Sequence, residues 1–489
     1  MQHRRSRVAS TLVSAILTLS AATATAQTTA IIADGETREE TTENTLPDSV
    51  VIESGGTLDL KASQSIDSLN LENGGLVELK NSITLTIGDN DGDSQLDGDI
   101  RAVQVDADIG GSLELAGSGT FDINADLSPI TFTISGDQTT VNFNKTDSLS
   151  FGTPGFNVTG KATINLNAED VFTQEGARSL SLDPTTNQAI DFNIQEDNLV
   201  SGDSSVGSKF ETGHATVINI EDGKTLQFDG LYFDHNGALA GNGHLVINNP
   251  NTPSANLGSS SAASSTHTGN VRISNTNTYF IIEEGSLAAS KALSFNNAGM
   301  EGTLASLPEI KSGALNQSLD LYLNESHVRF DDGATHQIDQ LTLDAESTVE
   351  IVSGAALSIG HSAGVSSIDG TVKGPGSLAI ASTSKSTSNT TVESAGQITN
   401  GLTVGNAITL INNGTISRND KTLATEVNDS GNVIAHDLKI TNAGTIEATV
   451  NNDALYLRDS DRAEITNSGT IEADGSTGIN LKLSDRADI

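Results

Sequence analysis

The sequence has no cysteine and few aromatic residues, and these absences narrow the choice of fold. Among its 489 residues there is no Cys and no Trp, there are only 8 Pro, and 3% of the residues are aromatic. Without Cys a disulfide scaffold is excluded, so stability has to come from packing and backbone hydrogen bonds. The scarcity of large aromatic side chains argues against an ordinary enzyme core and favours a thin interior of Val, Ile, Leu and Ala.

Positive charge is also scarce. Lys and Arg total 25 whereas Asp and Glu total 63, which gives a formal net charge of −38. Nucleic acid and anionic lipid are therefore poor partners, because binding either of them requires a basic surface. We expect the negative charge to keep a strand-rich surface soluble and separate from its copies.

Internal repetition is what the sequence has in abundance. Residues 440–448 read Ile-Thr-Asn-Ala-Gly-Thr-Ile-Glu-Ala, and residues 465–473 repeat this phrase with Ser in place of the first Ala. Apolar and polar residues alternate with period two, as in a strand with one buried face, while the Asn-x-Gly steps suit tight corners. A phrase that recurs after about 20–50 residues indicates a solenoid, whose units bury their apolar faces against one another. The sequence therefore predicts an all-β fold, a parallel β-helix (β-solenoid) with short strands and Gly/Asn-rich corners.

The repeated asparagines are interpreted as structural residues. In successive coils Asn412, Asn442 and Asn467 would stack above one another, where side-chain amides can form a ladder along the axis.

The N-terminus resembles a secretory signal. Arg4, Arg5 and Arg7 precede an apolar run, and small residues around Ala26 offer a cleavage site. A membrane anchor is the alternative, but the apolar run is short and is interrupted by Ser and Thr.

Four regions are predicted along the chain. Residues 1–26 form the signal peptide and residues 27–48 a loose N-terminal segment. Residues 49–396 form an irregular β-solenoid, and residues 397–489 form more regular repeats of about 24–30 residues. Two stretches rich in Ser and Thr, 259–268 and 381–391, are predicted to be loops that leave the coil.

Motifs that suggest chemistry are present but incomplete. Residues 360–364 match the G-x-S-x-G pattern of a serine nucleophile, yet strand-like sequence on both sides favours a glycine-flanked corner over the strand-to-helix elbow that this motif needs. Residues 89–97 form an acidic run similar to a calcium loop, but Ser94 replaces the Gly and Ile100 the Glu of the EF-hand pattern. A solvated acidic turn is the favoured interpretation.

The histidines suggest a further alternative. His235 and His244 lie near Asp229 and Asp234, which invites a polysaccharide lyase or hydrolase. Such enzymes need paired carboxylates in neighbouring coils, and no aligned pair with a basic partner can be named from the sequence. We therefore assign no catalytic, cofactor-binding or metal-binding residues and no cofactor, and we expect the protein not to be an enzyme.

The signal, the Gly-Gly strand pairs at 51–60 and 70–79, and above all the phrase at 440–448 and 465–473 carry a family resemblance. Together they resemble the passenger region of bacterial autotransporters, the surface proteins of type V secretion. The resemblance covers most of residues 49–489 and carries over no functional residues. It implies an exported β-helical stalk or adhesin at the cell surface or outer membrane of a Gram-negative bacterium, or released outside the cell.

The resemblance also implies a C-terminal membrane β-barrel, whose amphipathic segments this sequence does not contain. Because the sequence stops at Ile489, where a further repeat would begin, we expect it to be truncated before the barrel. The expected partners are an unidentified receptor or glycan on a host or neighbouring cell, and other copies of the chain. The favoured function is a non-catalytic structural or adhesive stalk, and a glycan-active β-helix enzyme is the alternative.

Overall fold

The computed structural model describes much of the chain from residue 29 onward. The described residues are 29–80, 82–88, 94–102, 111–124, 126–128, 131–146, 149–151, 155–177, 179–182, 188–201, 209–230, 232–248, 255–258, 265–275, 280–299, 307–331, 335–359, 367–373, 377–380, 384–386, 390–392, 397–399, 402–404, 409–412, 415–418, 423–425, 439–448, 454–458, 464–474 and 479–482. Within these ranges the chain forms short strands and turns and no helix. The predicted signal peptide, residues 1–26, lies outside them.

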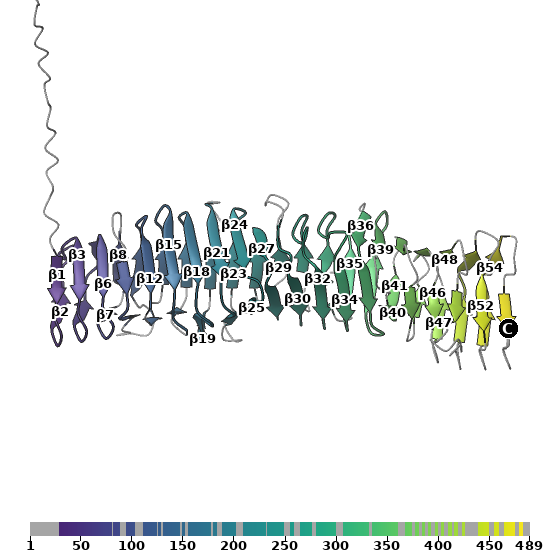
Figure 1. Cartoon of the computed structure of the whole chain (residues 1–489), viewed down its shortest axis with the longest axis horizontal. Coiled ribbons are helices and arrows are strands. Elements are labelled where there is room, and N and C mark those ends of the chain that lie inside the picture. The colour runs from purple at the N-terminus through teal and green to yellow at the C-terminus, as the bar shows by residue number, and fades with distance from the viewer. Residues whose placement is uncertain are drawn as a thin grey trace, which may run out of the picture.

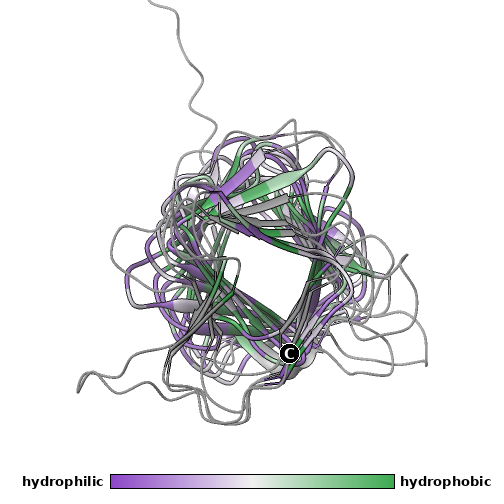
Figure 2. Ribbon diagram, turned by 90° about the vertical axis from the view of Figure 1, so that its right-hand side faces the viewer, coloured by the Kyte–Doolittle hydropathy of each residue, from purple (hydrophilic) through white to green (hydrophobic). Residues whose placement is uncertain are grey.

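The strands coil into a long rod, shown from the side in Figure 1 and along its axis in Figure 2. Most turns of the coil pass three faces in order, named A, B and C here, and strands on one face pair in parallel with those of the next turn. Between β27 and β36 the described strands lie on faces B and C alone, so face A consists of two separate sheets. The prediction of an all-β parallel β-solenoid is confirmed.

Face A begins at the first described residue. Its strands are β1 (Thr29–Ile32), β3 (Ser49–Ile52), β6 (Ser68–Leu71), β9 (Ser94–Leu96), β12 (Thr120–Ile123), β15 (Thr139–Phe143), β18 (Ala162–Leu166), β21 (Ile190–Ile194), β24 (Thr216–Ile220) and β27 (Ala238–Gly241), and then β36 (Thr335–Ile338), β39 (Ala356–Ile359), β42 (Ser377–Ile380), β45 (Gln397–Thr399), β48 (Thr415–Arg418), β51 (Thr445–Ala448) and β54 (Thr470–Ala473).

Face B follows face A in each turn. Its strands are β2 (Thr37–Glu40), β4 (Thr57–Leu60), β7 (Leu76–Leu79), β10 (Asp99–Ala102), β13 (Leu127–Ser128), β16 (Leu149–Phe151) and β19 (Phe172–Ala177), and then β22 (Asn198–Ser201), β25 (Thr225–Asp229), β28 (His244–Asn248), β30 (Asn270–Ser274), β32 (Ala292–Asn296), β34 (Asp320–Asn324), β37 (Gln340–Leu343), β40 (Ser367–Ile368), β43 (Ser384–Ser386), β46 (Leu402–Val404), β49 (Leu423–Thr425), β52 (Leu455–Arg458) and β55 (Ile479–Lys482).

Face C completes the turn. Its strands are β5 (Gln64–Ile66), β8 (Thr84–Ile87), β11 (Ser112–Leu115), β14 (Thr131–Ile134), β17 (Gly155–Val158), β20 (Ser179–Leu182), β23 (Lys209–Thr212), β26 (Tyr232–His235), β29 (Ala255–Leu257), β31 (Phe280–Ile282), β33 (Glu309–Ile310), β35 (His327–Phe330), β38 (Thr348–Ile351), β41 (Thr371–Lys373), β44 (Thr390–Val392), β47 (Thr409–Asn412), β50 (Lys439–Asn442) and β53 (Glu464–Asn467).

The period-two pattern of the sequence fixes which side chains enter the core. In β8, Leu85 and Ile87 are fully buried while Thr84 and Thr86 face outward, and the same alternation recurs on many strands. Parallel, in-register pairing then stacks like residues into rows along the axis, as in Leu85 on Leu113. The phenylalanines are few but are concentrated inside the coil, where several of them pack ring against ring.

Glycine closes the corners that the Gly-Gly pairs predict. Gly55 and Gly74 have φ values of +83° and +89°, which side chains with a Cβ rarely adopt. A Cβ on Gly56 would lie 2.7 Å from the carbonyl oxygen of Ile32 in the previous turn. These corners therefore need glycine for both backbone conformation and close stacking.

The coil begins earlier than the sequence predicts. The segment 27–48, predicted to be loose, contributes β1 and β2, which pair in register with β3 and β4. β2 was missed because its sequence, Thr-Arg-Glu-Glu, lacks apolar alternation. Its inward residue is Glu40, whose carboxylate lies 2.6 Å from the Arg38 guanidinium and accepts a hydrogen bond from Thr45. A charged residue is thus accommodated at the first turn by local polar partners.

The two Ser/Thr-rich stretches do not leave the coil as predicted where the structure describes them. Strand β43 lies within 381–391 and β44 begins there, and both pair with neighbouring turns. In the first stretch, Ser265 and His267 are buried, and the Ser265 hydroxyl accepts a hydrogen bond from the backbone N–H of Leu239. Hydrogen bonds to adjacent turns compensate for the lack of apolar side chains.

Asparagine ladders connect successive turns of the coil. Asn412, Asn442 and Asn467 share one register position, as predicted, and Asn442 Nδ2 lies 2.7 Å from Asn467 Oδ1. A longer ladder on face A was not predicted. In this ladder each asparagine amide donates a hydrogen bond to the residue at the same position in the preceding turn, over 2.7 to 3.2 Å. The ladder begins at the Asp122 carboxylate, which only accepts, and continues through Asn142, Asn165, Asn193 and Asn219.

Breaking the face A ladder at its centre should cost measurable stability. Asn165 donates to Asn142 and accepts from Asn193, so Asn165→Ala is expected to lower the free energy of unfolding by about 1–2 kcal/mol. Urea unfolding followed by circular dichroism measures the change. Thr163→Ala, on the same strand and the same outer surface, is the control. Equal losses in the two variants would show that the ladder adds nothing beyond ordinary strand propensity.

Candidate functional site

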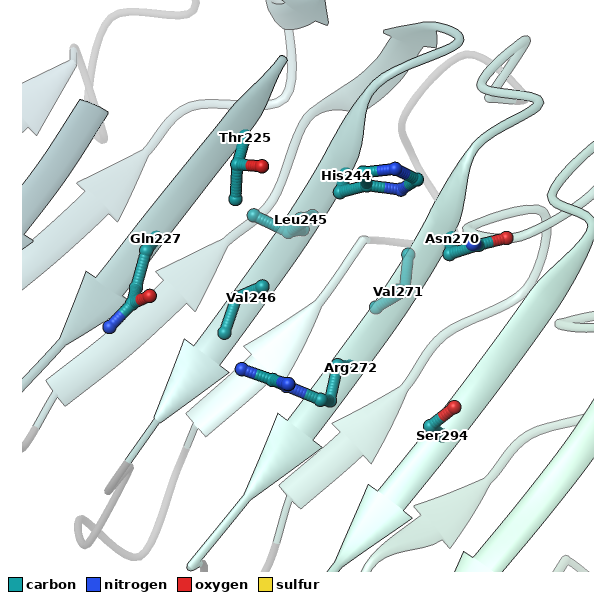
Figure 3. A pocket seen from close by; sticks show the side chains of 9 residues that line it. All are labelled: Thr225, Gln227, His244, Leu245, Val246, Asn270, Val271, Arg272 and Ser294. Carbon is teal, nitrogen blue, oxygen red and sulfur yellow. The ribbon is translucent and has the colours of Figure 1, made fainter. Parts of the chain in front are cut away.

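The outer surface of face B carries the candidate site, a shallow groove over β25, β28, β30 and β32. It has a volume of about 410 Å³, and Figure 3 shows its side chains on neighbouring parallel strands. The residues that line it are Thr225, Gln227, His244, Leu245, Val246, Asn270, Val271, Arg272 and Ser294. The strand register places Gln227, Val246, Arg272 and Ser294 in one outward row and Thr225, His244 and Asn270 in the next.

Local sequence explains why these side chains point outward. In β30 the residues Val271 and Ile273 are fully buried, so the alternation of the strand turns Asn270 and Arg272 to the outer surface. Figure 3 shows the Arg272 side chain extending from β30 toward β28. On that strand Val246 offers only a small apolar neighbour.

The groove is chemically unusual for so acidic a chain. Its lining contains an arginine, an imidazole, amides and hydroxyls, and no carboxylate. Arg272 is exposed and has no carboxylate within ion-pair distance in the described structure, whereas Arg38 and Arg101 each pair with a glutamate. The Nδ1 atom of His244 is buried and has no hydrogen-bond partner among the described residues. The groove therefore presents uncharged polar side chains together with one positive charge.

A second polar cluster lies on face C, at β23 and β26. Glu211 and Asp234 are partners in register on these adjacent strands, whose backbones lie about 4.8 Å apart along the axis. The Lys209 ammonium lies 2.5 Å from Glu211 and 5.2 Å from the centre of the Tyr232 ring, and the Tyr232 hydroxyl donates to Asp234 over 3.1 Å. This is the aligned carboxylate pair with a basic partner that could not be named from the sequence.

Burial raises the pKa of Asp234, and the negative charge of Glu211 raises it further. Hydrogen bonds from Tyr232 and Asn236 oppose this increase. A carboxyl group with a raised pKa beside a second carboxyl group has the minimum chemistry of a glycosidase. Here, however, Glu211 and Asp234 are already held by Lys209, Tyr232 and Asn236.

The structure separates the histidines and aspartates that the sequence placed close together. Asp229 and His244 belong to face B, on β25 and β28, whereas Asp234 and His235 belong to β26 on face C. Moreover, His235 points into the core and is fully buried. The four residues therefore do not form one site.

The other sequence motifs fall largely outside the described residues. Residues 360–366 lie outside the described part of the chain, so the Gly-x-Ser-x-Gly motif at 360–364 stays an untested prediction. Of the acidic run at 89–97 only Ser94 to Asp97 is described, and there Asp97 accepts hydrogen bonds from Gln95 and Asn124. In the described part of the chain, no group of three or more His, Asp or Glu side chains is placed to hold a metal ion.

The groove could not be predicted from the sequence. Alternation in β30 does signal that Arg272 faces outward, but its neighbours come from strands that are distant in the sequence and are joined by connections of unequal length. The register that brings Gln227, Val246 and Ser294 beside it carries no local sequence signal.

Comparison with known proteins adds no assignment: no family model, no curated protein and no solved structure matches this chain. Across the described residues there is also no helix of sufficient length and apolarity to span a membrane.

Proposed function

We propose that this chain is the exported, surface-displayed passenger of an autotransporter-type protein and that it acts as a non-catalytic adhesive stalk. The observation that carries the proposal is the continuity of the coil: on face C parallel pairing runs unbroken from β5 to β53, while faces A and B each carry two parallel sheets (Figure 1). A rod of this kind places a binding surface away from the structure that anchors it.

The chemistry of the chain agrees with this role. A solenoid is stabilised by contacts between neighbouring turns, so it can fold progressively as the chain emerges from a narrow pore. The chain has no Cys that could form a disulfide before export. A receptor or glycan on another cell is the proposed partner, and contact between copies of the rod is a further route to aggregation.

Surface display is tested in the Gram-negative bacterium that carries the gene. Antibodies raised against the purified chain should label intact cells, and protease added outside should remove both the labelling and the attachment of cells to surfaces. Deletion of the gene should have the same effect on attachment, and complementation should restore it. A chain that is protected from external protease until the cells are lysed would overturn the proposal.

A glycan-active enzyme is the second candidate, and the Glu211–Asp234 pair is the observation that favours it. Its test is the release of reducing ends or unsaturated products from acidic and neutral polysaccharides. The non-catalytic proposal predicts no release above that of Asp234→Asn. Release that is lost in Asp234→Asn and Glu211→Gln would establish the enzyme instead.

A further inference from the structure

The groove on face B continues into a longer track along the rod. The row that contains Arg272 and Ser294 proceeds to Tyr322 on β34, which is 38% exposed. With strands about 4.8 Å apart, Tyr322 lies about 10 Å along the axis from Arg272. The track thus offers a cation at one end and an exposed aromatic ring at the other, with small side chains between them.

An acidic residue marks the end of the positively charged part of the track. The carboxylate of Asp320, also on β34, accepts a hydrogen bond from the Tyr322 hydroxyl over 3.4 Å. A negatively charged ligand group is therefore repelled near Tyr322 and attracted near Arg272. This polarity orients an elongated ligand whose charged group lies over β30 and whose uncharged portion lies over β34.

Main-chain recognition is excluded at this surface. β28, β30 and β32 are each paired in parallel on both sides, so their backbone groups are already used and an extended peptide cannot add as a further strand. Recognition has to come from side chains. Hydroxyl and amide groups from Thr225, Gln227, Asn270 and Ser294 line the groove, and these groups suit a ligand rich in hydroxyls.

We propose that this groove binds a carboxylate-bearing oligosaccharide that lies along the axis of the rod. Arg272 pairs with a sugar carboxylate through two parallel hydrogen bonds. His244, Asn270 and Gln227 bind ring hydroxyls, and Tyr322 contacts the face of a neighbouring sugar ring. The inference rests on the adhesive role proposed above and names the class of glycan that the stalk would bind.

The overall negative charge of the chain excludes diffuse electrostatic attraction as a cause of binding to an acidic glycan. A net charge of −38 repels anions at a distance. A preference for a charged sugar over its neutral form therefore cannot arise from diffuse attraction and has to come from a local site.

The test is isothermal titration of the purified chain with the tetrasaccharide of galacturonic acid and, in parallel, with its methyl ester, which keeps the rings but removes the charges. The acid form is expected to bind more tightly. Arg272→Ala should weaken its binding by about tenfold and should remove the preference over the ester, and Arg272→Lys should give an intermediate loss because it keeps the charge but not the planar fork.

Two controls complete the experiment. Arg101→Ala removes an outward arginine that pairs with Glu78 on an earlier part of face B, and it should leave binding unchanged. Circular dichroism should show the same strand signal in all variants. Equal binding of acid and ester, no binding of either, or undiminished binding by Arg272→Ala would overturn the assignment.

The outcomes separate this inference from the function on which it rests. Cells that attach through the displayed chain while the purified chain ignores galacturonate would leave the adhesive stalk standing and overturn the groove. Tight, Arg272-dependent binding by a chain that stays inside the cell would support the groove and overturn the surface-displayed stalk.

Discussion

Replacing Phe233 with alanine is expected to lower the free energy of unfolding of the surrounding turns by about 4 kcal/mol. Phe233 is fully buried in β26 and stacks on Phe210 of the preceding turn, with ring centres 5.2 Å apart and planes 9° apart. It also contacts Phe228 at 5.4 Å and Phe280 at 6.4 Å. Truncation would therefore open a cavity shared by several turns and remove the ring contacts as well.

The loss should be local because each turn of a solenoid contacts only its neighbours. Hydrogen exchange measured by mass spectrometry should show faster exchange in β23, β26, β29 and β31, and unchanged protection from β1 to β6. Phe233→Leu is the control, since it keeps much of the buried volume and should cost roughly half as much. Equal losses in the two variants, or faster exchange along the whole rod, would show that the phenylalanine cluster is not the local determinant of stability.

The neighbours of Phe233 in the phenylalanine cluster could be predicted from the sequence only in part. Alternation predicts that Phe233 points inward, because Tyr232 and Asp234 flank it with polar groups. It does not predict that Phe210 lies beneath it, because that pairing depends on the length of the connections between β23 and β26. The scarcity of aromatics predicted a thin aliphatic interior. In the structure the phenylalanines instead gather in particular turns.

By contrast, the regular phrase near the C-terminal end was sufficient to predict register. Asn442 and Asn467 occupy the same position in two nearly identical phrases, so their stacking follows from the repeat alone. Ile446, which the same phrase places inward, is fully buried. Where repeats are nearly identical, the offset between copies gives the register directly.

The groove belongs to the part of the chain where no such phrase exists. β25, β28, β30 and β32 have unrelated sequences: β25, β30 and β32 share period-two alternation, whereas β28 has three apolar residues in succession. That property gives the outward direction of Arg272 but not its neighbours. The unpaired charge becomes evident only when the register shows that Val246 and Ser294, rather than a carboxylate, lie on either side.

Acidification is expected to destabilise the coil through His235, with most of the loss below pH 6.5. Burial lowers the pKa of this imidazole to about 3 from the ordinary value of 6.5. Between these two pH values the unfolded chain binds a proton that the folded chain excludes, so stability falls as the pH falls. At pH 4 the expected cost is about 3 kcal/mol relative to pH 7, and urea unfolding at a series of pH values measures it.

Two substitutions distinguish proton uptake from packing. His235→Gln keeps a polar side chain that can reach the Thr212 hydroxyl, which lies 2.9 Å from Nδ1 of His235, but it cannot titrate. His235→Leu matches Leu257, the residue at the same register position in the next turn. Both variants should flatten the pH dependence between pH 6.5 and 4, whatever they do to stability at pH 7. His267 and His336, whose pKa values are also lowered by burial, should contribute to the remaining slope, and carboxyl groups with raised pKa values such as Asp234 should oppose them. If both variants kept the slope of the parent chain, the acid sensitivity would have to come from other groups, and His235 would be only a packing residue.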